Sequence, residues 1–222
     1  MINKKSLIYI ASIACFTGCI GDFGVTFLLG NYDPGYSQLH NTMSALGISS
    51  SPVSEMISTW WILLGLLMIL YAYGLGKAFD FDKKYVKVAA LLLFLYGLGE
   101  GFGSGIFKAD HVKDSLTLSA ILHEIMGGFG VAAISFFPLA MNKVIHRTKN
   151  PGFHTLSLIV YFVGLFFLTI FLIRIIPRED NEAILYKGLW QRLFVLNYYL
   201  YMMVVAVIMI KKQQVDPHSN QI

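Results

Sequence analysis

The sequence predicts an all-α integral membrane protein, built as one domain (residues 1–222) that forms a bundle of six transmembrane helices. Of its 222 residues, 56% are hydrophobic and only 14% are charged. Mean hydropathy is +0.63, far above that of an ordinary soluble domain. The apolar residues fall into six runs of roughly 20 residues, the length that a helix needs to cross the hydrocarbon core.

The predicted spans end at polar residues, glycines or prolines. They cover residues 7–29, 56–76, 88–107, 118–141, 153–176 and 188–210. The longest connection, residues 30–55, joins the first two spans. His40 and Ser44 fall at helical spacing within it, which predicts a short helix at the membrane surface. Trp60 and Trp61, near one end of the second span, are typical of a membrane interface.

The distribution of basic residues predicts the orientation. Six spans place both termini on one side of the membrane, together with the turns at 77–87 and 142–152. That side carries 11 of the 17 Lys and Arg residues: Lys4, Lys5, Lys77, Lys83, Lys84, Lys87, Lys143, Arg147, Lys149, Lys211 and Lys212. Since basic loops stay in the cytoplasm, we expect both termini to be cytoplasmic in a multi-pass protein of the cell membrane.

The two cysteines allow two interpretations of the first apolar run. Cys15 and Cys19 lie four residues apart on one helix face, which favours packing residues over a disulfide framework. Alternatively, Lys4 and Lys5 before an apolar core that ends in Phe16-Thr17-Gly18-Cys19 are similar to a lipoprotein signal, with Cys19 lipidated. We favour the span, because apolar character continues past Cys19.

Sequence motifs exclude several function classes. The chain has no CxxC or HExxH pattern for a metal and no GxxxxGK phosphate loop. It also lacks a basic arm for nucleic acid. The lipid bilayer is therefore the one partner that the sequence predicts, no metal site is expected, and the sequence assigns no cofactor.

Polar side chains interrupt the apolar runs in a single layer. They are Asp22, Glu100, His123, Glu124, Arg174, Gln191 and Arg192. At 1.5 Å per residue, most of them lie roughly 6–12 Å below the outer ends of their spans. The inner halves of the predicted spans hold no charged side chain. Because ionisable groups are costly in lipid, we expect this polar layer to face the bundle interior.

The polar layer has a structural and a functional interpretation. Its carboxylates can neutralise Arg174, Arg192 and a protonated His123, and so fix helix packing without any chemistry. Alternatively, they line a pocket that is open to the outside. His123 could then exchange protons near neutral pH, and Arg192 could bind a carboxylate or phosphate.

Glycines in the third span predict close helix packing. Gly97, Gly101 and Gly105 lie four residues apart on one helix face, and Gly99 and Gly103 lie beside them. Small residues at this spacing let helix backbones approach closely in lipid.

Three motifs together resemble a known family. They are Ser44-Ala45-Leu46-Gly47 with Ser51-Pro52, Gly105-Ile106-Phe107-Lys108-Ala109-Asp110 before His123, and Gly188-Leu189-Trp190-Gln191-Arg192. In this order they are similar to the bacterial six-helix membrane family catalogued as domain-of-unknown-function family 998, over essentially the whole chain. The family typically has Phe-Pro where this chain has Phe107-Lys108. The resemblance implies six spans and no established activity. It gives weight to Ser44, Asp110, His123, Gln191 and Arg192.

The first functional hypothesis is a membrane-embedded, hydrolase-like enzyme that acts on a lipid headgroup or small polar ligand at the outer leaflet. His123 would be the general base or a metal ligand, oriented by Asp110 or Glu100, and Arg192 would hold an anion. The candidate binding residues are Arg192, Gln191, Ser44, Glu124, Asp22 and His40. No two histidines lie four residues apart, so a histidine-pair metal site is not supported.

Two other classes remain open. A small-solute or proton-coupled transporter could use Asp22, Glu100 and His123 as a relay. Against it, the charges stop in the outer half of the bundle, whereas transporter sites usually lie near the midplane. The third class is a non-catalytic binding, sensing or assembly protein.

The predicted orientation can be tested by labelling. A cysteine in place of Ser50 should react with an impermeant thiol reagent in intact cells, and one in place of Thr148 should not. The reverse pattern would reject the orientation, and a mature chain that begins at a lipidated Cys19 would establish the lipoprotein alternative.

Overall fold

The computed structural model describes residues 3–112, 115–148, 150–173 and 182–215. Its helices are α1 (Lys4–Gly30), α2 (Ser54–Phe79), α3 (Lys84–Tyr96), α4 (Ser104–Ile106), α5 (Leu118–Val144), α6 (Pro151–Ile173), α7 (Glu182–Leu185) and α8 (Lys187–Val215). α3 continues through the π-helical segment η2 (Gly97–Gly103) into α4, as one rod from Lys84 to Ile106. Among the described residues, six helices are long and apolar enough to cross a membrane. The predicted all-α fold with six membrane helices is confirmed.

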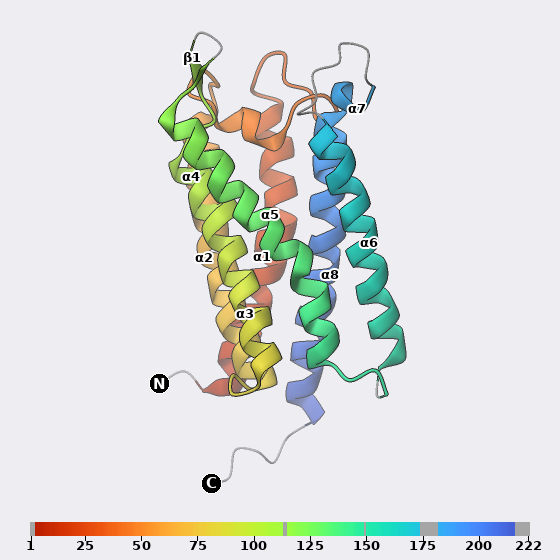
Figure 1. Ribbon diagram of the computed structural model, residues 1–222. Helices are drawn as coiled ribbons and strands as arrows, with labels where there is room; N and C mark the ends of the chain where they lie inside the picture. Colours follow the sequence, from red (N-terminus) through yellow and green to blue (C-terminus); the bar gives the residue numbers. More distant parts are fainter. Residues whose placement is uncertain (1–2, 113–114, 149, 174–181, 216–222) are drawn as a thin grey trace.

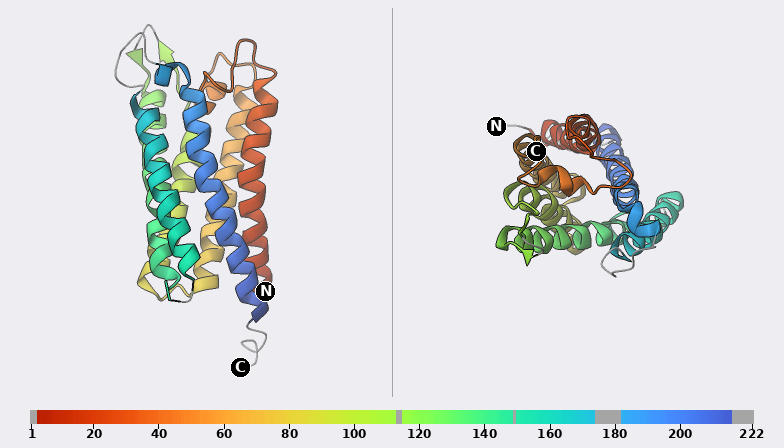
Figure 2. Two further views of the ribbon diagram at one scale, coloured as in Figure 1. Left: turned by 90° about the vertical axis from the view of Figure 1, so that its right-hand side faces the viewer. Right: turned by 90° about the horizontal axis from the view of Figure 1, so that it is seen from above.

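The six long helices form a ring in chain order. α1 packs against α2 and α8, and α3, α5 and α6 complete the circuit between them, as the end-on view in Figure 2 shows. α1 begins and α8 ends at the same end of the bundle (Figure 1). We call the opposite end the distal end. It carries the loop 31–53 with the 3₁₀ helix η1 (Met43–Gly47), and the hairpin of β1 (His111–Val112) and β2 (Ser115–Leu116).

Local sequence sets several helix ends. Asn3 caps α1, because its side chain accepts a hydrogen bond from the Ser6 N–H (2.7 Å). Thr117 caps α5 in the same way through the Ala120 N–H (3.1 Å). Asp80 ends α2 with φ of 77°, a conformation that Asp adopts more readily than most residues. The turn to α3 follows directly.

The glycine-rich rod is clamped between two neighbouring helices. A Cβ on Gly101 would lie 2.6 Å from the Gly65 nitrogen of α2. On another face of the rod, a Cβ on Gly99 would lie 2.7 Å from the Gly130 nitrogen of α5. Real Cβ atoms do not approach backbone this closely, so only glycine fits at these contacts. The rod therefore holds α2 and α5 at backbone contact distance on both sides.

The rod also contains a wide turn that the sequence did not predict. Within η2, the Ser104 N–H donates to the carbonyl of Gly99, five residues earlier, as well as to that of Gly101. Such π turns are rare and occur frequently at functional sites. Glu100 lies in this turn.

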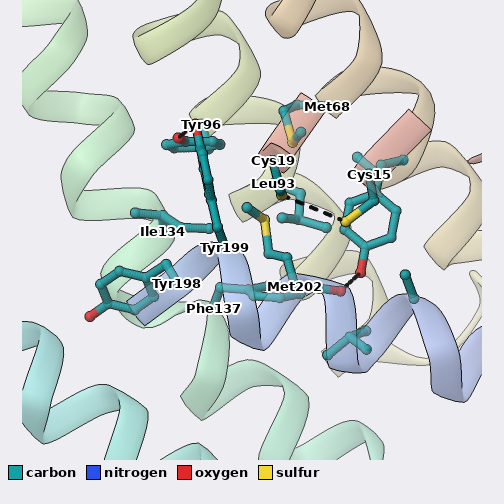
Figure 3. Packing of buried hydrophobic residues seen from close by; sticks show 14 of the residues in the cluster. Cys15, Cys19, Met68, Leu93, Tyr96, Ile134, Phe137, Tyr198, Tyr199 and Met202 are labelled. Atoms are coloured by element: carbon teal, nitrogen blue, oxygen red, sulfur yellow. Dashed lines mark hydrogen bonds between the residues drawn. The ribbon is translucent and has the colours of Figure 1, made fainter. Parts of the chain in front are cut away.

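Large aromatic and sulfur-containing side chains pack together in the centre of the ring (Figure 3). The Tyr71 hydroxyl donates to the Met202 carbonyl across the bundle (2.9 Å). Cys15 and Cys19 are both buried, with their sulfur atoms 4.0 Å apart. They pack inside the bundle as free thiols. This core occupies the centre of the ring on the side of the termini.

Two details differ from the sequence-based expectations. Trp61 is buried and Trp60 is half-buried, so neither is a simple interfacial side chain, and the Trp60 indole N–H donates to Asp22 (3.0 Å). The expected surface helix is a 3₁₀ helix that begins only at Met43. His40 and Asn41 precede it, because Asn41 instead closes a turn by accepting from the Ser37 N–H (2.8 Å).

The glycine contact predicts that even alanine is too large at Gly101. Gly101→Ala should lower the free energy of unfolding by about 1–3 kcal/mol, the usual cost of overpacking, and Gly101→Leu by more. Thermal unfolding in detergent measures both. The matched control is Gly24→Ala, because a Cβ on Gly24 would meet no atom within 4 Å. Equal stability of the Gly101 variants and the wild type would show that the rod does not pack in this way.

Candidate functional site

A cavity of about 140 Å³ lies in the distal half of the ring, between the rod, α5, α6 and α8. Its lining is partly polar and partly apolar. The polar lining comes from Asp22, Ser44, Tyr96, Glu100, Ser104, His123, Glu124, Gln191 and Tyr199. The apolar lining includes Leu64, Val131, Leu168, Phe171, Leu172, Phe194 and Val195. Six of the nine residues that the sequence singled out thus line one cavity.

His123 enters this wall from α5 and is only 7% exposed. Its Nδ1 lies 2.8 Å from the carbonyl oxygen of Phe107. Because a carbonyl can only accept, Nδ1 must carry the proton in this bond, and in the neutral ring Nε2 then has a lone pair. Among the described residues Nε2 has no hydrogen-bond partner. The Phe107 carbonyl thus fixes both the tautomer and the orientation of the ring.

Asp22 is the centre of a hydrogen-bond chain that joins four helices. It is 3% exposed, and it accepts from Trp60 Nε1 (3.0 Å) and from the Tyr199 hydroxyl (2.9 Å). The Tyr199 oxygen in turn accepts from the Tyr96 hydroxyl (3.0 Å). Burial of a carboxylate is costly unless its oxygens are hydrogen-bonded. Trp60 and Tyr199 meet this requirement with neutral donors, one to each carboxylate oxygen.

Glu100 and Glu124 line the cavity from two neighbouring helices, the rod and α5. Glu100 packs against α5, where a Cβ on Gly130 would lie 2.9 Å from its Cγ and one on Gly127 would lie 3.5 Å from its Oε1. Glu124 follows His123 on α5 and is exposed. Because Gly127 and Gly130 have no side chains, α5 leaves room for the Glu100 carboxylate, which lines the same cavity as His123 and Glu124.

The loop 31–53 forms the distal wall of the cavity. Gln191 Oε1 accepts from the Met43 N–H (2.7 Å) at the start of η1. The Ser44 hydroxyl, the next residue along, lies 3.0 Å from that of Thr42. Gly188 also holds this loop, because a Cβ there would lie 2.8 Å from the Gln38 carbonyl oxygen. The third sequence motif thus contacts the loop at Gln38 and at Met43, the residue directly before the first motif.

Arg192 binds the loop and does not line the cavity, which corrects the expectation that it faces the polar layer. Its Nη1 donates to the carbonyls of Asn41 and Gly188 (both 3.0 Å). Its Nη2 donates to the Tyr36 hydroxyl and to Gln38 Oε1 (both 2.6 Å). Four neutral oxygen atoms take up the guanidinium, so it is not directed at a ligand carboxylate or phosphate.

Tyr36 bridges Arg192 and the loop backbone. Burial raises the pKa of the Tyr36 hydroxyl, and the nearby Arg192 guanidinium partly opposes this shift. The hydroxyl consequently keeps its proton and donates it to the Thr42 carbonyl (3.1 Å) while it accepts from Arg192. The loop, the guanidinium and η1 are thereby joined in one network.

Asp110 and His40 lie outside the cavity. The Asp110 carboxylate accepts from the backbone N–H (2.7 Å) and hydroxyl (2.6 Å) of Ser49. It therefore ties the loop 31–53 to the segment before the hairpin and does not orient His123. The His40 side chain is exposed and its ring packs on that of Tyr186, with 5.2 Å between centroids. Arg174 lies outside the described residues.

Several lining residues were missed by the sequence interpretation. Tyr96 and Ser104 lie four residues before and after Glu100, so helical spacing from Glu100 would have identified them. Trp61 carried no such signal, because an aromatic residue near a span end more often marks the interface, and Tyr199 is one of several aromatic residues within its span. Among the residues that the structure covers, no group of three or more His, Cys, Asp and Glu side chains is placed to hold a metal ion.

The fold and the cavity define a class, that of the polytopic helical membrane proteins with an internal, partly polar site. Within it, the chain belongs to the family described as Protein of unknown function (DUF998), which matches residues 17–208. No curated protein and no solved structure matches the chain.

The Arg192 network predicts that Arg192→Lys loosens the loop 31–53. Lysine cannot reproduce the forked contact. The loss of one hydrogen bond to a charged group costs about 1.5–3 kcal/mol, so amide exchange should accelerate about ten- to a hundredfold. Hydrogen exchange of the Met43 amide measures this. Arg147→Lys, at an exposed site at the other end, is the control, and unchanged exchange in Arg192→Lys would contradict the network.

Proposed function

We propose that the protein is a membrane-embedded, hydrolase-like enzyme whose site takes a lipid headgroup or a similar small polar group. We further propose that the distal end faces the cell exterior and that both termini lie in the cytoplasm, as the basic residues favour. The membrane would be the inner membrane of a bacterium, in line with the family resemblance. The outer leaflet would then be the side on which the site works.

The observation that carries this proposal is the state of His123. It is a buried histidine on a cavity wall, with Nδ1 bound to a backbone carbonyl and with Glu100 and Glu124 lining the same space. This fixation leaves Nε2 as a proton acceptor. Glu100 and Glu124 supply carboxylate oxygens in the same cavity lining. A general base needs such a proton acceptor.

The proposed step is the hydrolysis of an ester by water. Nε2 of His123 takes a proton from a water molecule as the water oxygen bonds to the carbonyl or phosphoryl centre. The ester C–O or P–O bond breaks, and the departing oxygen receives a proton from the imidazolium. One water is consumed, an acid and an alcohol leave, and His123 returns to its neutral form.

The remaining lining residues would position the reacting group. Gln191 and Ser44, a residue of η1, line the distal wall of the cavity. Asp22, with the hydroxyls of Tyr199 and Tyr96, adds further polar lining. The packed core that includes Met68, Tyr71 and Met202 fills the ring toward the termini. This arrangement favours a site that is reached from one side over a transport path through the bundle.

The experiment is a hydrolysis assay with the full chain in vesicles of phosphatidylethanolamine and phosphatidylglycerol. Mass spectrometry would follow released headgroups and fatty acids. His123→Ala should lower the rate by about 10²–10⁴-fold, the usual contribution of a general base. His154→Ala, near the opposite end of the bundle, should leave it unchanged.

Two results would contradict the proposal. Equal rates in His123→Ala and the wild type, with release above empty vesicles, would remove His123 from the chemistry. A wild type that releases nothing while it retains a bound ligand would establish a binding role without turnover.

A further inference from the structure

Some residues of α5 and α6 line the cavity and are also exposed at the side of the bundle; we call this edge between the two helices the side opening. These residues are Glu124 and Gly128 of α5 and Leu172 of α6, which is 45% exposed. The two helices lie together at the end that carries the termini and diverge toward the distal end (Figures 1 and 2). Pro138 lies inside α5, where it removes a helical hydrogen bond and favours a bend.

Apolar side chains flank this opening on both helices. They are exposed and large: Ile121, Ile125 and Phe129 on α5, and Phe166 and Leu172 on α6. Both helices are among those apolar enough to span a membrane, so their exposed faces meet acyl chains. The side opening consequently connects the cavity with the hydrocarbon region.

Two glycines keep the opening wide without a packing reason. A Cβ on Gly128 would meet no atom within 4 Å, and one on Gly127 would make only an ordinary contact with Glu100. Gly99 and Gly101, by contrast, are required by backbone contacts. A glycine inside a helix costs roughly 1 kcal/mol relative to alanine. At Gly128 the absent side chain leaves empty space at the cavity edge. It does not bring neighbouring atoms closer, so packing does not explain this glycine.

The size and chemistry of the cavity suit one end of a larger molecule. Its volume, about 140 Å³, is close to that of an engineered protein cavity of roughly 150 Å³ that binds benzene. A group of this size fits beside His123. Leu168, Phe171 and Leu172 of α6 line the cavity, and Leu172 is also exposed at the side opening. Any longer part of the ligand would therefore pass along these residues into the bilayer.

We propose that the ligand of this site is a membrane lipid that enters sideways between α5 and α6. Its polar end reaches His123 and its acyl chain runs past Phe171 and Gly128. The inference rests on the proposed function for the role of His123. It adds the ligand class and the route, with the bilayer as the source of the ligand.

Photolabelling in the bilayer tests the route. The full chain is placed in phosphatidylcholine vesicles in which a small fraction of the lipid carries a diazirine in its acyl chain. After irradiation, peptide mass spectrometry locates the adducts. Phe166 is 59% exposed and Phe171 only 9%, so Phe166 reports lipid outside the bundle and Phe171 reports lipid inside the cavity. The wild type should carry adducts at both.

Filling the opening should separate the two signals. Gly128→Leu has room for its side chain, so it should fold normally, reduce the Phe171 adducts severalfold and leave those at Phe166. Gly24→Leu, the matched control on a lipid-facing glycine without near neighbours, should change neither. Adducts at Phe166 with none at Phe171 in the wild type would overturn the inference, even if Gly128→Leu failed to fold. Undiminished Phe171 adducts in a folded Gly128→Leu protein would overturn it too.

The same measurement separates this inference from the catalytic proposal. His123→Ala should keep the Phe171 adducts, since His123 lies beyond the entry. Adducts at Phe171 without hydrolysis of any vesicle lipid would support lipid entry and reject the catalytic role. Hydrolysis of a water-soluble ester without Phe171 adducts would do the reverse.

Discussion

The architecture depends on the backbone contact that the glycine-rich rod makes with two helices at once. Gly101 meets Gly65 of α2, and Gly99 meets Gly130 of α5. In a bilayer, where water expulsion does not drive helix association, such close contacts supply much of the attraction. They fix α5 against the rod at its distal half. α5 thereby diverges from α6, and the divergence leaves the cavity with Glu100 at its edge.

The polar groups of the distal half then divide into two systems. One is structural: Arg192 donates three of its four described hydrogen bonds to the loop 31–53 and the fourth to Gly188 of its own helix. Asp110 attaches the same loop to the neighbouring connection. The other surrounds the cavity, where Asp22 is held by neutral donors and His123 by one carbonyl. The first system holds the distal wall of the cavity in place.

The sequence predicted the parts of this arrangement that follow from spacing along a helix. The lengths of the apolar runs predict six spans, and equal depth predicts that Asp22, Glu100 and His123 meet. Spacing along a helix did not predict the hydrogen bonds of side chains that can reach partners on several different segments. Arg192 lies at the same depth, but nothing in the order of residues shows that loop oxygens reach it first. The wide turn around Glu100 was equally hidden, because glycine fits α- and π-helical turns alike.

The most direct test of the account is an experimental density map of the protein, purified from its membrane with its lipid retained. If a lipid occupies the cavity, we expect elongated density between the distal halves of α5 and α6. Its polar end should lie beside His123 and its chain along Phe171. The account also predicts that Arg192 stays bound to the loop. Distal halves of α5 and α6 in contact along their length, with no space beside His123, would contradict it.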